Sequence, residues 1–388
     1  MKKHLLYCLP ALILLMSCTL SKPYSGEPES NRFAKGFSIV QGENYTKILA
    51  YSPWQDGQIL QTYYLVKSDT VSTPKDGITL RIPVQRLTVT SCTHIGFLKA
   101  LGCLDAVYGI CSPEIVYNRE VFTPADGHEV MNVGDAMTPD VERIIRTAPE
   151  AVMVSTYAQG DAATEKLRSL AVPIIYNNEW TENDPLARAE WIRFVGAFFD
   201  CLPLADSIFD EVVASYNALK AKTENITDRR TIMSGNNFRG TWYMPAGSTY
   251  MGVLFRDAGA DYFYASDTSH FSLPLGIETV INNFSEADVW VGCPAKSLAE
   301  LAQMDEKHTW FKSFKNGEVY NFARRTTATG GNDFWETGVV HPEYILHDLI
   351  NILYPALPCS SIPSCSSAPS GSSAIPVDTT FYFSMHLE

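Results

Sequence analysis

Residues 138–154 read TPDVERIIRTAPEAVMV, and this stretch indicates the class of fold. The opening Thr-Pro-Asp is typical of a helix start, where a capping side chain, a fixed φ and an acid at the positive end of the dipole are favourable. Apolar residues then recur at helical spacing until Pro149. The unbroken apolar run at 151–154 is typical of a buried strand in a parallel sheet. Helices alternating with buried strands predict an α/β fold.

A second stretch, ETVINNFSEADVWV at 278–291, repeats the pattern 136 residues further along. In each copy a Glu, Glu142 or Glu278, begins an amphipathic turn, and a Glu-Ala pair eight residues later leads into an apolar strand. The repeat predicts two similar α/β lobes. The helix dipole alone favours an acid at these two positions. Docking to a basic partner is the functional interpretation of the pair.

The rest of the chain divides around these copies. Segment 37–183 forms the predicted N-terminal α/β lobe and begins with strand-like alternation up to about residue 90. Segment 184–226 has no strand pattern and is predicted to be the helix between the lobes, and 227–388 is the predicted C-terminal α/β lobe. The latter contains a Ser/Pro/Cys-rich insertion at 358–376, after which 381–383 is a candidate edge strand. We therefore expect two Rossmann-like lobes joined by one long helix, with a ligand cleft between them.

The first residues have the features of an export signal. A basic start and an apolar run of about a dozen residues precede Cys18, so 1–17 is predicted to be a lipoprotein signal peptide. The residues before Cys18 resemble a lipobox, which predicts lipidation of its thiol and amine and a membrane anchor at this end. An ordinary cleaved signal peptide is the alternative. The polar segment 18–36 is expected to be a tether.

The overall composition limits the function. The formal charge is −13, and without Lys2 and Lys3 of the leader 28 basic residues face 43 acidic ones. An acidic balance argues against nucleic-acid binding, which needs basic patches. The Cys and His residues lack the spacing of a metal or redox motif, no hydrolase or nucleotide-binding signature occurs, and Cys359 and Cys365 are the one candidate pair. We therefore expect no catalytic site, no bare-metal site and no resident cofactor.

Taken together, these segments resemble a known family, the substrate-binding lipoproteins of ABC importers for siderophores, haem and cobalamin. The resemblance covers about residues 80–354 and rests on the order and spacing of several pieces: LTVTS at 87–91, FLKALG at 97–102, VYGI at 107–110, the two repeat copies, and GNDFWE at 331–336. It implies two lobes joined by one rigid helix, a solute between them, and one Glu per lobe contacting the permease. Those positions match Glu142 and Glu278. The strands before residue 87 and the late insertion depart from the family pattern.

Solute-contacting residues are expected on loops that follow the carboxyl ends of strands. Aromatic side chains suit large organic ligands, and Arg suits anionic ones. Core packing is an alternative for every aromatic candidate, and Arg324-Arg325 has the simpler explanation of a solvated pair. The predicted ligand-binding residues are Tyr117, Tyr157, Trp180, Phe238, Arg239, Trp242, His270, Phe271 and Trp335.

The function predicted from these observations is capture of an iron complex (siderophore or haem) or cobalamin. The expected partners are this metal-containing solute and an ABC permease/ATPase complex of the inner membrane. The protein is expected to be monomeric and anchored in the periplasm through Cys18. Two alternatives stay open. One is a surface-exposed lipoprotein that scavenges haem or cobalamin for an outer-membrane receptor, and the other is an enzyme that reuses this fold on a chelated cofactor.

Overall fold

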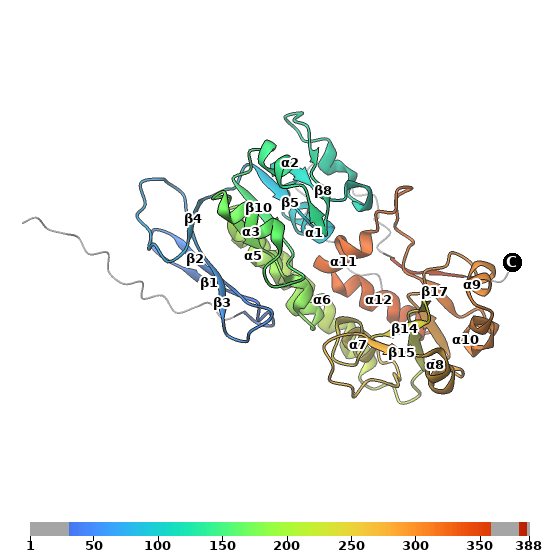
Figure 1. The fold of residues 1–388 in the computed structure, drawn as a ribbon. Helices are drawn as coiled ribbons and strands as arrows, with labels where there is room; N and C mark the ends of the chain where they lie inside the picture. Colours follow the sequence, from blue (N-terminus) through green and yellow to red (C-terminus); the bar gives the residue numbers. More distant parts are fainter. Residues whose placement is uncertain (1–30, 358–379, 386–388) are drawn as a thin grey trace, which may run out of the picture.

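The computed structural model describes residues 31–357 and 380–385 (Figure 1). The signal peptide, Cys18, most of the tether and the 358–376 insertion with Cys359 and Cys365 lie outside the described residues. One cluster of buried apolar residues runs through both lobes and the N-terminal strands. Within the described ranges, no helix combines the length and apolar content needed to cross a membrane.

The first lobe is built on a parallel sheet with the strand order β11-β10-β5-β6-β7. Helices α1, α2 and α3 begin at side-chain caps supplied by Ser91, Asp140 and Asp161. The predicted helix cap at Thr138 is wrong by two residues: the observed cap is Asp140, because Thr138 and Pro139 pair with a neighbouring strand as a small hairpin. The elements are β5 (Leu87–Val89), α1 (Cys92–Ala100), β6 (Val107–Ile110), β7 (Met131–Asn132), β8 (Gly134–Asp135), β9 (Thr138–Pro139), α2 (Val141–Arg146), β10 (Ala151–Val154), α3 (Ala162–Ser169) and β11 (Ile174–Tyr176).

The residues before the first lobe form a separate four-stranded sheet, in the order β1-β2-β3-β4. Its strands are β1 (Phe37–Gln41), β2 (Thr46–Tyr51), β3 (Ile59–Val66) and β4 (Ile78–Arg81). Strand positions were predicted by the alternation, but the sheet does not join the parallel sheet of the lobe. Its inner face packs on the helices that leave the lobe, with Phe37 and Tyr63 touching Phe194 edge to face. It lies at the left of Figure 1.

The connection between the lobes consists of three helices, whereas one helix was predicted for 184–226. They are α4 (Pro185–Ala189), α5 (Trp191–Phe198) and α6 (Leu202–Thr223). The break before α6 follows from Asp200, whose φ of 55° is left-handed, and from Pro203 in the first turn of α6. Only α6, with 22 residues and a length of about 33 Å, spans a lobe.

The second lobe repeats the helix–strand order of the first. Its sheet has the order β12-β16-β17-β18, with β18 antiparallel at the edge, so the predicted return of the chain as an edge strand is confirmed. A small antiparallel sheet, β13-β14-β15, is added beside it. The elements are β12 (Ile232–Ser234), β13 (Asn237–Phe238), β14 (Thr241–Met244), α7 (Tyr250–Asp257), β15 (Leu273–Leu275), α8 (Ile277–Phe284), β16 (Val289–Val291), α9 (Leu298–Met304), α10 (Lys312–Lys315), β17 (Val319–Asn321) and β18 (Phe383–Ser384).

A C-terminal segment makes a second connection between the lobes. It contains the 3-10 turn η6 (Asp333–Trp335) and helices α11 (Thr337–Val340) and α12 (Pro342–Leu353), and α12 lies alongside α6 (Figure 1). α11 packs on α1 of the first lobe so closely that a Cβ on Gly96 would overlap the Glu336 backbone. The other 3-10 turns are η1 (Leu104–Ala106), η2 (Pro113–Ile115), η3 (Arg119–Phe122), η4 (Glu179–Thr181) and η5 (Glu306–Trp310).

Candidate functional site

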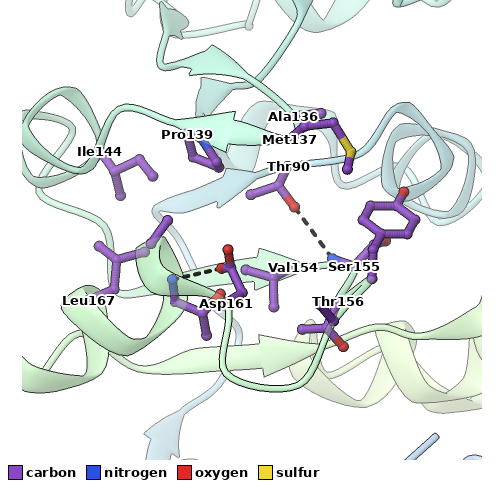
Figure 2. Close-up of a pocket in the computed structure, with 14 residues that line it drawn as sticks. Thr90, Ala136, Met137, Pro139, Ile144, Val154, Ser155, Thr156, Asp161 and Leu167 are labelled. Atoms are coloured by element: carbon purple, nitrogen blue, oxygen red, sulfur yellow. Dashed lines mark hydrogen bonds between the residues drawn. The ribbon is translucent and has the colours of Figure 1, made fainter. Parts of the chain in front are cut away.

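A pocket of about 190 Å³ lies at the carboxyl edge of the first-lobe sheet (Figure 2). Its wall combines the ends of β5 and β10 with the β8–β9 hairpin and the start of α3. The carboxyl edge is where ligands bind to open α/β sheets, because the loops that leave neighbouring strands diverge there. Residues lining the pocket include Thr90, Met137, Pro139, Ser155, Thr156, Tyr157 and Asp161.

Hydrogen bonds fix the loop after β10 at this pocket. The Ser155 amide donates to Thr90 Oγ1 over 3.4 Å, and Ser155 Oγ lies 3.1 Å from Nε2 of the buried His94. Burial lowers the pKa of His94 to about 3, so its imidazole is neutral at physiological pH. Asn178 Oδ1 accepts from both the amide and the hydroxyl of Thr156, each over 2.9 Å. The loop is therefore held by hydrogen bonds to buried side chains of the first lobe.

Two predicted ligand-binding residues, Tyr157 and Trp180, come together beside this loop. Their ring centroids are 5.2 Å apart with a tilt of 32°, and half of the Tyr157 surface is exposed. Partial burial raises the pKa of the Tyr157 phenol, and nearby Glu179 raises it further, so the phenol keeps its proton. An aromatic pair with one open side offers a flat apolar surface to a ligand.

A buried ion pair behind these rings was missed by the sequence analysis. Glu179 is fully buried, and its Oε1 lies 3.3 Å from Arg188 Nη2, while the Arg188 guanidinium lies 5.1 Å from the Tyr250 ring centre. Burial raises the pKa of Glu179, and Arg188 partly offsets that rise. No sequence pattern marks this pair, because its partners sit in a 3-10 turn and in a short helix nine residues later.

In the second lobe, four of the five predicted residues are exposed. Phe238 ends β13 and Arg239 lies in the turn that joins it to β14, and the Arg239 guanidinium lies 5.1 Å from the Phe238 ring centre. Arg239 has a φ of 53°, which the tight turn requires. His270 Nδ1 lies 2.7 Å from Asn183 Nδ2 of the segment entering α4, and Phe271 is 74% exposed. The contact between His270 and Asn183 places the loop that carries His270 and Phe271 beside the last residues of the first lobe.

The fifth residue, Trp242, does not fit a ligand-binding role, which corrects the prediction. Its side chain is fully buried, and its Nε1 donates to the Ser234 carbonyl over 2.8 Å. Its ring packs 5.4 Å from Trp290 and 5.8 Å from Phe311. Alternation along β14 decides this, since Trp242 points to the core and Tyr243 points outward.

Tyr117 and Trp335 lie where the C-terminal segment meets the first lobe. The Tyr117 amide donates to Glu336 Oε1, and Trp335 is 40% exposed beside Phe334. The interpretation of Arg325 as a solvated residue is wrong. Its Nη2 lies 2.6 Å from Asp333 Oδ2, and that carboxylate is buried.

Known proteins share the two-lobed fold that carries these residues. A family profile described as "Periplasmic binding protein" matches residues 89–325, which cover most of both lobes. The chain belongs to this family. Of the predicted ligand-binding residues, only Trp335 lies outside the matched range. The extra N-terminal sheet and the C-terminal segment also lie outside it.

Curated relatives of this periplasmic binding protein include two uncharacterized lipoproteins of Methanocaldococcus jannaschii. One is 26% identical over 286 residues, which cover 71% of this chain and 66% of the relative. The other is 22% identical over 319 residues, which cover 74% of this chain and 77% of the relative.

Solved structures show the same fold. The periplasmic heme-binding protein RhuT from Roseiflexus sp. RS-1 superposes with a TM-score of 0.54 at 17% identity, covering 71% of this chain and 99% of that one. The periplasmic vitamin B12 binding protein BtuF of Vibrio cholerae gives 0.52 at 12% identity, covering 70% and 96%. At these identities the likeness concerns the fold alone.

The two repeat copies occupy equivalent places in this periplasmic binding protein. Glu142 is the second residue of α2, which precedes β10, and Glu278 is the second residue of α8, which precedes β16. Both side chains are exposed, and Glu278 Oε1 lies 3.8 Å from Lys307 Nζ. Among the residues that the structure describes, no group of three or more His, Cys, Asp or Glu side chains is placed to hold a metal ion.

Proposed function

We propose that this chain is the solute-binding component of an ABC importer and that it binds a bulky metal-containing solute between its lobes. The observation that carries the proposal is the arrangement of loops at the carboxyl edge of the first-lobe sheet. There the Tyr157–Trp180 pair borders a pocket, and Asn183 joins this side to His270 of the second lobe. Structures with the same fold are named as heme-binding and vitamin B12 binding proteins, which supports this class of solute.

The pocket is large enough for only part of a bulky solute. Sites for organic ligands of drug size usually have about 300–1,000 Å³. The pocket of about 190 Å³ is smaller than that, and a haem, ferric siderophore or cobalamin is larger than a typical drug. We therefore place one part of the solute at Thr90, Ser155 and Tyr157, with the remainder reaching the exposed second-lobe residues Phe271 and Arg239.

The experiment that tests the proposal is native mass spectrometry, combined with absorption spectra, of the protein offered haem, ferric siderophores or cobalamin. We expect a 1:1 complex with one of these classes. Binding should weaken in Tyr157→Ala and stay unchanged in Trp54→Ala, because Trp54 lies in the N-terminal sheet region, away from the pocket. Failure of all three classes to bind would contradict the proposal.

We further propose that Glu142 and Glu278 contact basic residues of the permease. They are exposed, equivalent by the internal repeat and carried by different lobes. Exposed ion pairs contribute about 0.2–1 kcal/mol each, so their role is orientation and steering more than affinity. Attachment to a membrane through lipidated Cys18 also remains a proposal, and it is supported by the lipoprotein names of the M. jannaschii relatives.

Replacing both acids, in Glu142→Ala with Glu278→Ala, is expected to leave solute affinity intact and to reduce uptake several-fold, since two interactions of this size are lost together. The matched control replaces two other exposed acids, Glu43 and Glu224, with Ala. Uptake by cells expressing each variant in place of the native protein is the measurement. Equal uptake by both double variants would exclude the docking role.

A further inference from the structure

Two free cysteines meet where the first lobe joins the helices that lead to the second lobe. Cys103 lies between α1 and η1, and Cys201 is the residue that caps the start of α6. Their thiols share a hydrogen bond, although the two residues lie far apart in the sequence. Both side chains are half-buried and pack against the apolar core. Local spacing in the sequence gives no sign of this pair.

The backbone holds each of these cysteines on the helix that precedes it. The Cys103 amide donates to the Leu98 carbonyl of α1 over 2.8 Å. The Cys201 amide donates to the Gly196 carbonyl of α5 over 3.0 Å, and Cys201 Sγ lies 3.5 Å from the same oxygen. Helices α1 and α5 also pack on each other. The contact between the thiols therefore follows from the packing of two helices.

A cavity of about 340 Å³ beside the pair makes one of the thiols accessible. Cys103 and Phe199 are among the residues that line it, and none of its lining residues lines the solute pocket. Cys111 and Cys293 have different surroundings, since both are buried and their sulfur atoms contact backbone carbonyls. Cys103 is thus within reach of a reagent and already in contact with a second thiol.

We propose that Cys103 and Cys201 form a disulfide in the exported protein and that this bond fastens the start of α6 to the first lobe. Thiols already in contact can be joined without backbone movement, which more distant cysteines would need. The chain belongs to a family of periplasmic binding proteins, and the periplasm is a compartment where disulfides form and persist. That the protein reaches such a compartment rests on the predicted export.

Formation of the bond requires a disulfide as the oxidant, supplied by a thiol oxidase or by a small molecule such as oxidised glutathione. The Cys103 thiolate attacks one sulfur of this disulfide and expels the first thiol. The Cys201 thiolate then attacks the Cys103 sulfur and expels the second. Two protein thiols are oxidised, the incoming disulfide is reduced to two thiols, and these thiols take up the protons that the cysteines lose.

The main effect of the bond should be on stability. It closes a loop of about 100 residues in the unfolded chain, and the loss of chain entropy on cross-linking grows with the length of the loop. In the folded protein it joins segments whose helices already pack on each other. The bond should therefore raise the melting temperature and leave the solute pocket unchanged.

Peptide mass spectrometry of the exported, full-length protein tests the proposal. Free thiols are alkylated in denaturant at cell lysis, and the unreduced protein is digested with chymotrypsin, which cleaves after Tyr108 and so separates Cys103 from Cys111. We expect a Cys103 peptide joined to a Cys201 peptide, with Cys111 alkylated. Oxidised glutathione should restore the link in reduced protein. Cys103→Ala should abolish the linked peptide, whereas Cys111→Ala should retain it.

Thermal unfolding measures the contribution of the bond. A reductant should lower the melting temperature of the native protein by several degrees. The fall should be smaller in Cys103→Ala, which cannot form the bond but keeps Cys359 and Cys365, the other candidate pair. Equal falls in the two proteins would overturn the fastening role.

Alkylation of both Cys103 and Cys201 after treatment with oxidised glutathione would overturn the proposal, as would a link from either residue to a different cysteine. If Cys103→Ala does not fold, the linked peptide of the native protein decides the matter. None of these measurements needs a solute. A failure to form the disulfide and a failure of the proposed solute binding are therefore distinguishable.

Discussion

The two lobes have equivalent helices and strands, but they present different surfaces at their carboxyl edges. In the first lobe, Thr156 and Ser155 are held by buried partners, and Tyr157 rests on Trp180. In the second lobe, Phe238 and Phe271 are mostly exposed, at 57% and 74%. We infer that the first lobe offers a surface formed before the solute arrives, and that the second lobe adapts to it. Pre-organisation of one side lowers the entropy that binding must overcome.

The largest effect should come from breaking the buried Glu179–Arg188 ion pair that lies behind the Tyr157 and Trp180 rings of the first lobe. Arg188→Met leaves Glu179 buried without its partner, and we expect the free energy of unfolding to fall by about 3–5 kcal/mol. Urea denaturation provides the measurement. Arg168→Met removes the exposed partner of Glu165 and should cost less than about 1 kcal/mol. Equal losses in the two variants would show that the Glu179–Arg188 pair does not hold this surface in place.

Replacing one asparagine in each lobe compares how strongly the two surfaces are held in place. Asn178→Ala removes the acceptor of the buried Thr156 amide and should destabilise the protein by about 1–3 kcal/mol. Asn237→Ala removes bonds to Gly240 and Asp305 in a half-buried hairpin, where water replaces them, and should cost less than about 1 kcal/mol. The same unfolding measurement applies to both. A larger loss in Asn237→Ala would reverse the assignment of the fixed and the adaptable side.

The smallest effects should appear in solute binding. Tyr157→Ala should weaken affinity by an amount corresponding to about 0.5–1.5 kcal/mol, because its ring is already oriented by Trp180. Phe271→Ala should weaken affinity less, because its ring must first be ordered. Titration with the solute identified by mass spectrometry measures both. A greater loss in Phe271→Ala would place the main recognition surface in the second lobe.

Sequence patterns predicted the architecture better than the site. Caps, apolar periodicity and the Glu-Ala repeat gave the two lobes, and the order of the pieces gave the family. The sequence pattern wrongly predicted Trp242 as a ligand-binding residue, because a strand as short as β14 shows too little alternation to reveal which side faces the core. The sequence pattern also gave no sign that Glu179, Arg188 and Glu336 are buried. These charged residues look like surface residues until distant segments cover them.

By itself, the sequence determined the alternating helices and strands, the two copies of the helix–strand unit and the positions of Glu142 and Glu278, because these follow from neighbours within about ten residues. Only the tertiary structure decided that the C-terminal segment returns to α1 and that Glu336 meets Tyr117 and Asn118. Contacts between residues more than 200 positions apart leave no local period or spacing. They arise from the packing of whole helices and strands, which decides which side chains are buried. Burial in turn decides which charged groups have a shifted pKa.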